Sequence, residues 1–138
     1  MTRNACVLMA VVLILAASCE GVSYKDSSAP VEKRVEDLLS RMTLEEKVGQ
    51  MTQITITALA NGTELTPAGD SIMRTYKVGS VLNTPGDMAQ TPEAYDKLIQ
   101  ELNRISLETT GIPCLYGLDH IHGTTYIAGG ILFPQEIN

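Results

Sequence analysis

The feature that most constrains the fold is an apolar segment that ends at a single carboxylate and a glycine-rich loop. Residues 113–118 read Pro-Cys-Leu-Tyr-Gly-Leu, and Asp119 follows them directly. The loop beyond Asp119 holds both histidines of the chain and three of its eleven glycines. A buried strand of an α/β barrel presents polar side chains at its carboxyl end in this way. The pattern predicts a buried strand at residues 113–118 and a functional carboxylate at Asp119.

Helices and strands are expected to alternate along the rest of the chain. Thr43 and Glu46 have the spacing of a capping box, in which each side chain accepts a hydrogen bond from the other residue's amide. Thr91-Pro92 opens the clearest helix, and Gly111 ends it. The first half is expected to form helices at 31–42 and 44–49, a strand at 50–56, a loop marked by Asn61-Gly62 and Pro67, and a short helix around 72–76. A strand at 80–82, a loop at 83–90, a helix at 91–110 and the strand at 113–118 are expected to follow. The core stripe of the helix at 91–110 is expected to contain Tyr95, Leu98, Ile99, Leu102 and Ile105. This order suits a barrel or a doubly wound sheet.

The first residues are typical of an export signal. Arg3 precedes an apolar run from Cys6 to Ala17, which is too short to span a bilayer. The run ends in Ala16-Ala17-Ser18-Cys19, which resembles a bacterial lipoprotein processing site, although Ala16 stands where Leu is commonest. We expect residues 1–18 to be a signal peptide, Cys19 to carry a lipid, and residues 19–30 to form a polar tether. The protein would then be exported to the periplasm, outer membrane or cell surface, with possible membrane attachment through Cys19; cleavage without lipidation is the alternative.

The remaining composition argues against several classes of function. Removal of residues 1–18 takes away Arg3 and no acid, so the formal net charge falls from −6 to −7. An acidic chain with few clustered bases argues against nucleic acid as a partner. No spacing of Cys and His predicts a metal site, no glycine-rich phosphate loop is present, and no cofactor is expected. Cys114 is expected to be a small buried hydrophobe rather than a reactive thiol.

Three segments resemble the family-three glycoside hydrolases, most closely their β-glucosidase and β-glucan exohydrolase members. They are Arg34–Met51, Lys77–Leu82, and the stretch from Tyr-Gly-Leu-Asp at 116–119 through Ile-His-Gly to Phe133-Pro134. Those enzymes are several times longer than this chain. The resemblance implies that residues 31–138 are the N-terminal, truncated part of a (β/α)8 TIM-type barrel, with its first three strands and the preceding helix pair.

The resemblance also implies which catalytic groups to expect. Retaining glycoside hydrolysis needs a carboxylate nucleophile and a second carboxyl about 5–5.5 Å away. In the family the nucleophile is an Asp on a later strand, commonly followed by Trp, and this chain contains no Trp. We therefore expect neither catalytic carboxyl in this chain, and the fragment alone to be inactive.

Asp119 and His122 are the candidate site residues. Asp119 matches the family's substrate-binding Asp, whose two oxygens accept hydrogen bonds from neighbouring sugar hydroxyls. Its structural alternative is to cap the amides of the following loop. His122 is expected to bond within its own loop and to hold Asp119 in place, and no role is assigned to His120.

The function implied is that of an exo-acting retaining β-glucosidase, which removes terminal β-D-glucosyl residues from β-linked oligosaccharides or glucosides. A β-xylosidase or N-acetylhexosaminidase of the same family is an alternative within the class. A non-catalytic surface lipoprotein that binds glycans is the alternative from another class.

Overall fold

A computed structural model of the chain describes residues 23–86 and 88–134. The expected signal peptide and Cys19 lie outside the described residues, as does the first part of the expected tether. The chain divides into two compact units, Met1–Met42 and Thr43–Asn138. Within the described ranges, no helix combines the length and the apolar character needed to cross a membrane.

The first unit contains helix α2 (Val31–Arg41), as predicted. The chain before it turns back along the helix, because the Tyr24 amide donates to Asp37 Oδ2 over 2.8 Å and Arg34 Nε donates to the Tyr24 carbonyl over 2.8 Å. Asp37 also pairs with Arg41 over 2.8 Å. No residue of α2 is buried; Val31, Val35 and Leu39 are exposed and Leu38 is half-buried.

The second unit is built on a parallel sheet of three strands. These are β1 (Gln53–Thr55), β4 (Ser80–Leu82) and β5 (Leu115–Gly117), and their order in the sheet is β1-β4-β5. Residues Gln53, Ser80 and Leu115 are aligned in register, as are Thr55, Leu82 and Gly117. A short antiparallel hairpin, β2 (Ala60–Asn61) and β3 (Glu64–Leu65), follows the 3₁₀ turn η1 (Ile56–Ala58). The fold is a mixed helix and sheet arrangement, as the alternating pattern predicts.

Local capping explains where the helices of this unit begin. In α3 (Leu44–Gln50) the predicted capping box is present, with Thr43 Oγ1 accepting from the Glu46 amide and Glu46 Oε2 accepting from the Thr43 amide. Helices α4 (Pro67–Tyr76) and α5 (Pro92–Thr110) each begin with a threonine cap followed by proline. Gly111 ends α5 with a φ of 73°, which glycine adopts at little steric cost.

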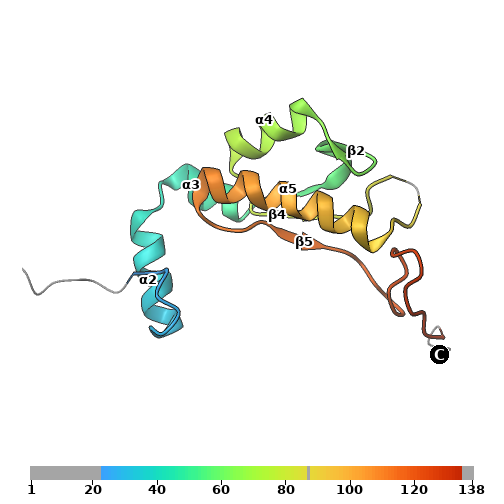
Figure 1. Cartoon of the computed structure of the whole chain (residues 1–138). Coiled ribbons are helices and arrows are strands. Elements are labelled where there is room, and N and C mark those ends of the chain that lie inside the picture. The colour runs from blue at the N-terminus through green and yellow to red at the C-terminus, as the bar shows by residue number, and fades with distance from the viewer. Residues whose placement is uncertain (1–22, 87, 135–138) are drawn as a thin grey trace, which may run out of the picture. The chain divides into compact units, whose positions relative to one another are not determined.

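One hydrophobic core joins the helices to a single face of the sheet. The middle residues of the three strands, Ile54, Val81 and Tyr116, belong to it, and α4 and α5 lie together over that face (Figure 1). On the opposite face Gln53, Thr55 and Leu115 are exposed. The fully or nearly buried core residues are Ile56, Leu59, Met73, Val78, Val81, Leu98, Leu102, Ile105 and Cys114.

Several boundaries differ from the sequence prediction; for example, the strand predicted at 113–118 is limited to Leu115–Gly117. The strand predicted from 50 to 56 is limited to Gln53–Thr55, because α3 continues to Gln50 and a 3₁₀ turn begins at Ile56. The segment predicted as a loop around Asn61-Gly62 forms the β2–β3 hairpin, with Gly62 at a φ of 58°. The α4 helix begins earlier than predicted because Thr66 caps it through the Gly69 amide.

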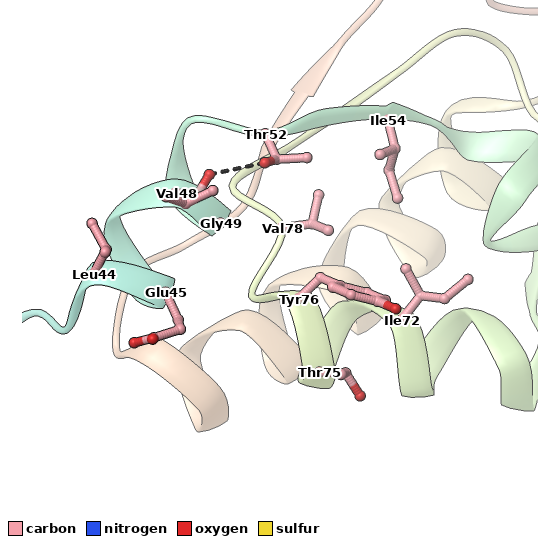
Figure 2. Close-up of a pocket in the computed structure, with 10 residues that line it drawn as sticks. All are labelled: Leu44, Glu45, Val48, Gly49, Thr52, Ile54, Ile72, Thr75, Tyr76 and Val78. Atoms are coloured by element: carbon pink, nitrogen blue, oxygen red, sulfur yellow. Dashed lines mark hydrogen bonds between the residues drawn. The ribbon is translucent and has the colours of Figure 1, made fainter.

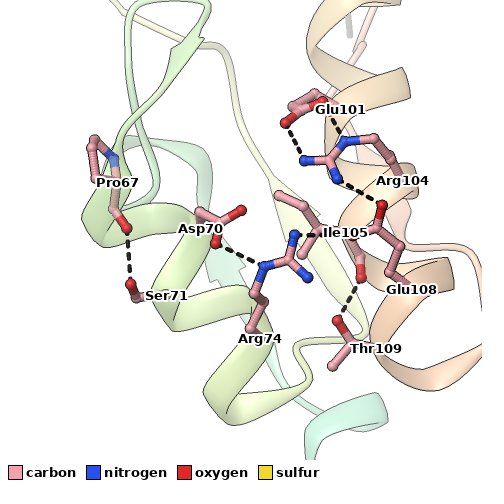
Figure 3. Close-up of polar contacts among 9 residues, drawn as sticks. All are labelled: Pro67, Asp70, Ser71, Arg74, Glu101, Arg104, Ile105, Glu108 and Thr109. Carbon is pink, nitrogen blue, oxygen red and sulfur yellow. Dashed lines mark hydrogen bonds and ion pairs between the residues drawn. The ribbon is translucent and has the colours of Figure 1, made fainter.

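A network of ion pairs connects the outer surfaces of α4 and α5 (Figure 3). Arg74 of α4 contacts Asp70 over 2.8 Å and Glu108 of α5 over 3.0 Å. Arg104 contacts Glu101 over 2.6 Å and Glu108 over 2.7 Å. Hydrogen bonds from Arg104 and then Arg74 lower the pKa of Glu108, so its charge persists into mildly acid solution. Exposed pairs of this kind are individually weak, and Arg74–Glu108 is the pair among these four that connects the two helices.

Two glycines allow α3 to lie against the segment that enters β4. The Gly79 amide donates to the Gly49 carbonyl over 2.9 Å. A Cβ atom added to Gly49 would collide with the carbonyl oxygen of Tyr76 and would lie 2.6 Å from that of Lys77. Neither backbone oxygen can rotate away, so this contact requires glycine.

We expect Gly49→Ala to destabilise the protein by about 1–3 kcal/mol, as overpacking does. The sign is informative because alanine would stabilise an open helix by about 1 kcal/mol relative to glycine. Urea unfolding measures the change. Gly117→Ala is the matched control, because its added Cβ would meet the flexible terminal Cδ1 of Leu82 at 3.0 Å and would lie at ordinary contact distance, 3.9 Å, from the Val81 carbonyl oxygen. A Gly49→Ala protein as stable as the control would contradict the close approach of α3.

Candidate functional site

The candidate site lies where strands β4 and β5 end. Parallel strands bring their carboxyl ends to one edge of a sheet, and the loops that follow them meet there. The loop after β4 covers residues 83–91, and the segment after β5 covers residues 118–134; Figure 1 shows both beyond the same end of the sheet. Asp119, His120 and His122 all belong to the second of these loops.

Backbone hydrogen bonds fold the segment after β5 back on itself. The Thr124 amide donates to the Ile131 carbonyl over 2.8 Å, and the Phe133 amide donates to the His122 carbonyl over 3.0 Å. Gly123 has a φ of 90°, and a Cβ atom there would collide with the Ile131 carbonyl oxygen. The glycine therefore permits a close backbone contact inside this loop. The Phe133 side chain is exposed and does not pack into the core of the described residues.

Gln90 joins the two loops. Its amide donates to the Tyr126 carbonyl over 3.3 Å, and its carbonyl accepts from the Ala128 amide over 2.8 Å. Its side chain Nε2 donates to the carbonyls of Pro85 and Met88 within its own loop. Gln90 thus bonds to backbone groups of both loops, and the position of the Asp119 loop depends on the loop after β4.

Two tyrosines anchor the site to the core. Tyr95 of α5 donates its hydroxyl to the Tyr126 carbonyl over 3.2 Å, and Tyr116 of β5 donates its hydroxyl to the Asn83 carbonyl over 2.7 Å. The two rings meet edge to face, with centroids 6.1 Å apart. Burial raises the pKa of both hydroxyls, so both remain protonated donors at neutral pH.

Sequence reasoning assigned Tyr95 to the helix core and missed this second role. The available signal was the choice of tyrosine at core positions, since a buried phenol hydroxyl needs a hydrogen-bond partner where phenylalanine would need none. Gln90 carried no comparable signal, because its partners in the second loop, the backbone groups of Tyr126 and Ala128, are far away in the sequence.

The Asp119 side chain is exposed. Among residues 23–86 and 88–134, none makes a recorded hydrogen bond or ion pair with its carboxylate. The backbone turns immediately after it, where the His120 amide donates to the Leu118 carbonyl over 3.0 Å.

The two histidines lie in different settings. The His120 ring stacks on the Tyr126 ring at a centroid distance of 5.7 Å and a tilt of 33°. His122 lies where the loop closes, since its carbonyl accepts from Phe133. Its expected action on Asp119 stays a prediction.

Cys114 directly precedes β5 and belongs to the hydrophobic core. It is buried, and burial raises the pKa of its thiol to about 11, so the group is neutral at physiological pH. In the part of the chain that the structure describes, no three His, Cys, Asp or Glu side chains gather as a metal site would require.

The second unit also has an apolar groove of about 500 Å³, formed by α3, β1 and α4 (Figure 2). Val48, Ile54, Ile72 and Tyr76 contribute apolar walls. Tyr76 and Val78 precede β4, so the groove is reached from the amino end of the strands, away from Asp119. It lacks the convergent polar groups that a sugar site needs.

No family model matches the sequence, but three curated glycosidases are similar to it. It is 35% identical over 114 residues to a "Lysosomal beta glucosidase" of Dictyostelium discoideum, covering 74% of the chain and 14% of that protein. It is 33% identical over 121 residues to a "Putative beta-xylosidase" of Formosa agariphila, covering 83% of the chain and 16% of that protein. It is 33% identical over 115 residues to a "Probable beta-glucosidase C" of Aspergillus oryzae, covering 77% of the chain and 17% of that protein.

The chain is a homologue of glycoside hydrolases, consistent with the N-terminal region of the family-three enzymes. The similarity confirms the resemblance predicted from the three sequence segments, and the matched length corresponds to most of the chain. The chain spans between 14 and 17% of the length of these glycosidase relatives.

We expect Tyr95→Phe to loosen the Asp119 loop without unfolding the unit. The substitution removes the hydroxyl that holds the Tyr126 carbonyl, and one such bond contributes about 1 kcal/mol. Hydrogen exchange at the Thr124 and Ala128 amides should accelerate several-fold. Tyr76→Phe is the control, because the Tyr76 side chain is 65% exposed and distant from this loop in sequence. Unchanged exchange in Tyr95→Phe would show that Gln90 alone holds the loop.

Proposed function

We propose that this chain is part of an exo-acting retaining β-glucosidase that hydrolyses terminal β-D-glucosyl residues of oligosaccharides or aryl glucosides. The observation that carries the proposal is an exposed carboxylate just beyond the carboxyl end of a parallel strand, with no recorded hydrogen bond or ion pair to any described residue, in a homologue of β-glucosidases. In this proposal the substrate is a neutral β-linked glycoside, and the chain supplies binding groups.

We propose further that the described sheet is the first part of a (β/α)8 barrel. Its strand order follows the chain order, with each new strand added beside the last, as in barrels. The helices cover one face, and the other face keeps Leu115 72% exposed. Within the described residues β1 pairs on one side only, and the apolar groove lies next to it. Further strands and helices of a longer polypeptide would cover these surfaces.

Asp119 is proposed to bind the terminal sugar. Ionised carboxylates accept hydrogen bonds from donors, and two neighbouring hydroxyls of a glucosyl ring present two donors at suitable spacing. The alternative role, capping the amides of its own loop, receives no support from the hydrogen bonds recorded among the described residues. His122, three residues later, is proposed to orient this part of the loop.

The nucleophile and the acid/base carboxyl are proposed to come from other parts of the longer protein. The 138-residue chain alone should therefore not hydrolyse glycosides.

A β-xylosidase activity is the second candidate, and the name of the Formosa agariphila relative favours it. The two sugars differ in the hydroxymethyl group, so paired assays with glucoside and xyloside decide between them.

The decisive test of Asp119 uses the longer protein that contains this chain. We expect Asp119→Ala to lower kcat/KM for an aryl β-glucoside at least about 10²-fold, or about 2.7 kcal/mol. The bonds to the sugar should strengthen as the ring approaches the oxocarbenium-like transition state. Asp96→Ala is the control, because Asp96 is an exposed carboxylate on α5 that bonds only to Gln100 among the recorded contacts.

Deoxy substrates separate binding from structure. When Asp119 is replaced, kcat/KM should fall much less for a glucoside that lacks the hydroxyls held by Asp119 than for the parent glucoside. Equal losses for both substrates, or a variant that does not fold, would make Asp119 a structural residue. A wild-type protein that cleaves no β-glycoside would contradict the proposed function itself.

We also propose that the protein is exported and attached to a membrane through a lipid on Cys19. The apolar run of residues 6–17 and the small residues before Cys19 support this. Cys19→Ala should move the protein from the membrane fraction to the soluble fraction and abolish labelling with a fatty-acid probe. Cys6→Ala is the control, because Cys6 belongs to the same signal segment but not to the processing site. Unchanged fractionation and labelling in Cys19→Ala would contradict lipidation.

A further inference from the structure

Asn83 has a backbone conformation that most residues avoid. Its φ is 81°, and Lys77 is the only other non-glycine residue with positive φ in the described ranges. This left-handed region costs a typical L-residue roughly 1–2 kcal/mol, although Asn tolerates it better than most. Some feature of the structure must therefore hold Asn83 there.

Strand β5 holds both backbone polar groups of Asn83. Its amide donates to the Gly117 carbonyl over 3.1 Å, and its carbonyl accepts from the Tyr116 hydroxyl over 2.7 Å. Tyr116 is itself supported by the edge of the Tyr95 ring. The backbone of Asn83 is thus fixed by neighbours from β5 and, through Tyr116, by α5.

The Asn83 side chain has no such partner. It is exposed, and among the described residues no recorded hydrogen bond involves its carboxamide. Asn often occupies the left-handed region because its side chain bonds to nearby backbone, but no such bond is recorded here. If only the backbone conformation mattered, glycine would supply it without strain. The carboxamide is the additional property that Asn brings to this position.

Asn83 and Asp119 leave the sheet side by side. Leu82 and Gly117 are register partners on adjacent strands, which lie about 4.8 Å apart in a sheet. Asn83 follows Leu82 directly, and Asp119 follows Gly117 by two residues. The two polar side chains therefore emerge at the same edge, from neighbouring strands.

The two groups have complementary hydrogen-bonding capacity. An ionised carboxylate only accepts, whereas a carboxamide both donates and accepts. A sugar hydroxyl that donates to Asp119 still has lone pairs that need a donor. The Asn83 carboxamide is such a donor, placed one strand away.

We propose that Asn83 is a further substrate-binding residue, whose carboxamide bonds to a hydroxyl of the same terminal sugar that Asp119 binds. Tyr116 is a positioning residue, which acts by holding the Asn83 carbonyl. The proposal rests on the proposed glycosidase function and goes beyond it by assigning a second recognition group.

Asn83→Gly in the longer protein tests this directly. Glycine removes the carboxamide but adopts the same positive φ, so the fold should be retained and the melting temperature should not fall. We expect kcat/KM for an aryl β-glucoside to fall at least tenfold and the inhibition constant of glucose to rise by a similar factor. Lys77→Gly is the matched control, because it makes the same backbone change at the end of α4, where φ is 54°; it should leave kcat/KM unchanged.

Monodeoxy glucosides identify the hydroxyl concerned. For one of them, the loss caused by Asn83→Gly should nearly disappear. In addition, Tyr116→Phe should lower kcat/KM in the wild type but have little further effect in the Asn83→Gly background, since a positioning residue acts through its partner. Independent, additive losses would overturn the role of Tyr116.

The outcomes separate this inference from the function on which it rests. An active wild type with an equally active Asn83→Gly variant would overturn the Asn83 assignment and leave the glycosidase function intact. Equal losses of kcat/KM on every deoxy substrate would also overturn it, because the Asn83 carboxamide would then affect the backbone of the site rather than bind a sugar hydroxyl. A wild type without β-glycosidase activity would overturn both.

Discussion

The pairing of β4 with strands on both sides is the constraint on which most of the second unit depends. β4 is the middle strand, and its central residue Val81 is fully buried. Because β1, β4 and β5 are parallel, the chain must return to the same end of the sheet before each new strand. Helices α4 and α5 make those returns, and both bury their apolar faces on the side of Val81. The carboxyl ends of β4 and β5, and with them Asn83 and Asp119, are placed together as a consequence.

The loops at this end are ordered by backbone hydrogen bonds more than by apolar burial. Gln90 and Tyr95 bind backbone groups of the Asp119 loop, while Tyr116 binds the backbone of Asn83. These partners come from α5, from β5 and from the loop after β4. The arrangement leaves the side chains of Asn83 and Asp119 exposed while their backbones are fixed. Such preorganisation suits a binding site, because the ordering of the polar groups does not have to be supplied by the ligand.

Apolar surfaces remain exposed in this unit partly because the helices cover only one face of the sheet. The helices cover one face of the sheet, so Leu115 on the other face is exposed, as are Leu44 and Val48 beside the apolar groove. Contiguous exposed apolar surface is typical of interaction sites and of aggregation-prone surfaces. This agrees with a chain that spans a small share of the length of its glycosidase relatives.

Local sequence signals determined most of the secondary structure. The capping box at Thr43 and Glu46, the Thr91-Pro92 start and the Gly111 end each act over three or four residues, and all three are confirmed. The start of β1 was misplaced because α3 continues to Gln50, and the β2–β3 hairpin was missed because each of its strands is only two residues long. The resemblance to family-three glycoside hydrolases was also evident from three sequence segments, because it depends on residue types and their order along the chain.

Only the tertiary structure decided how the site is supported. Tyr116 and Asn83 are 33 residues apart in sequence, and Tyr95 and Tyr126 are 31 residues apart. No local pattern predicts such pairs, because each depends on the register of β4 with β5 and on where α5 crosses the sheet. The sequence by itself indicated Asp119, since an apolar strand ending in one carboxylate is a local signal. Asn83 became a candidate only when the fold placed it beside Asp119, with a backbone conformation that its neighbours impose.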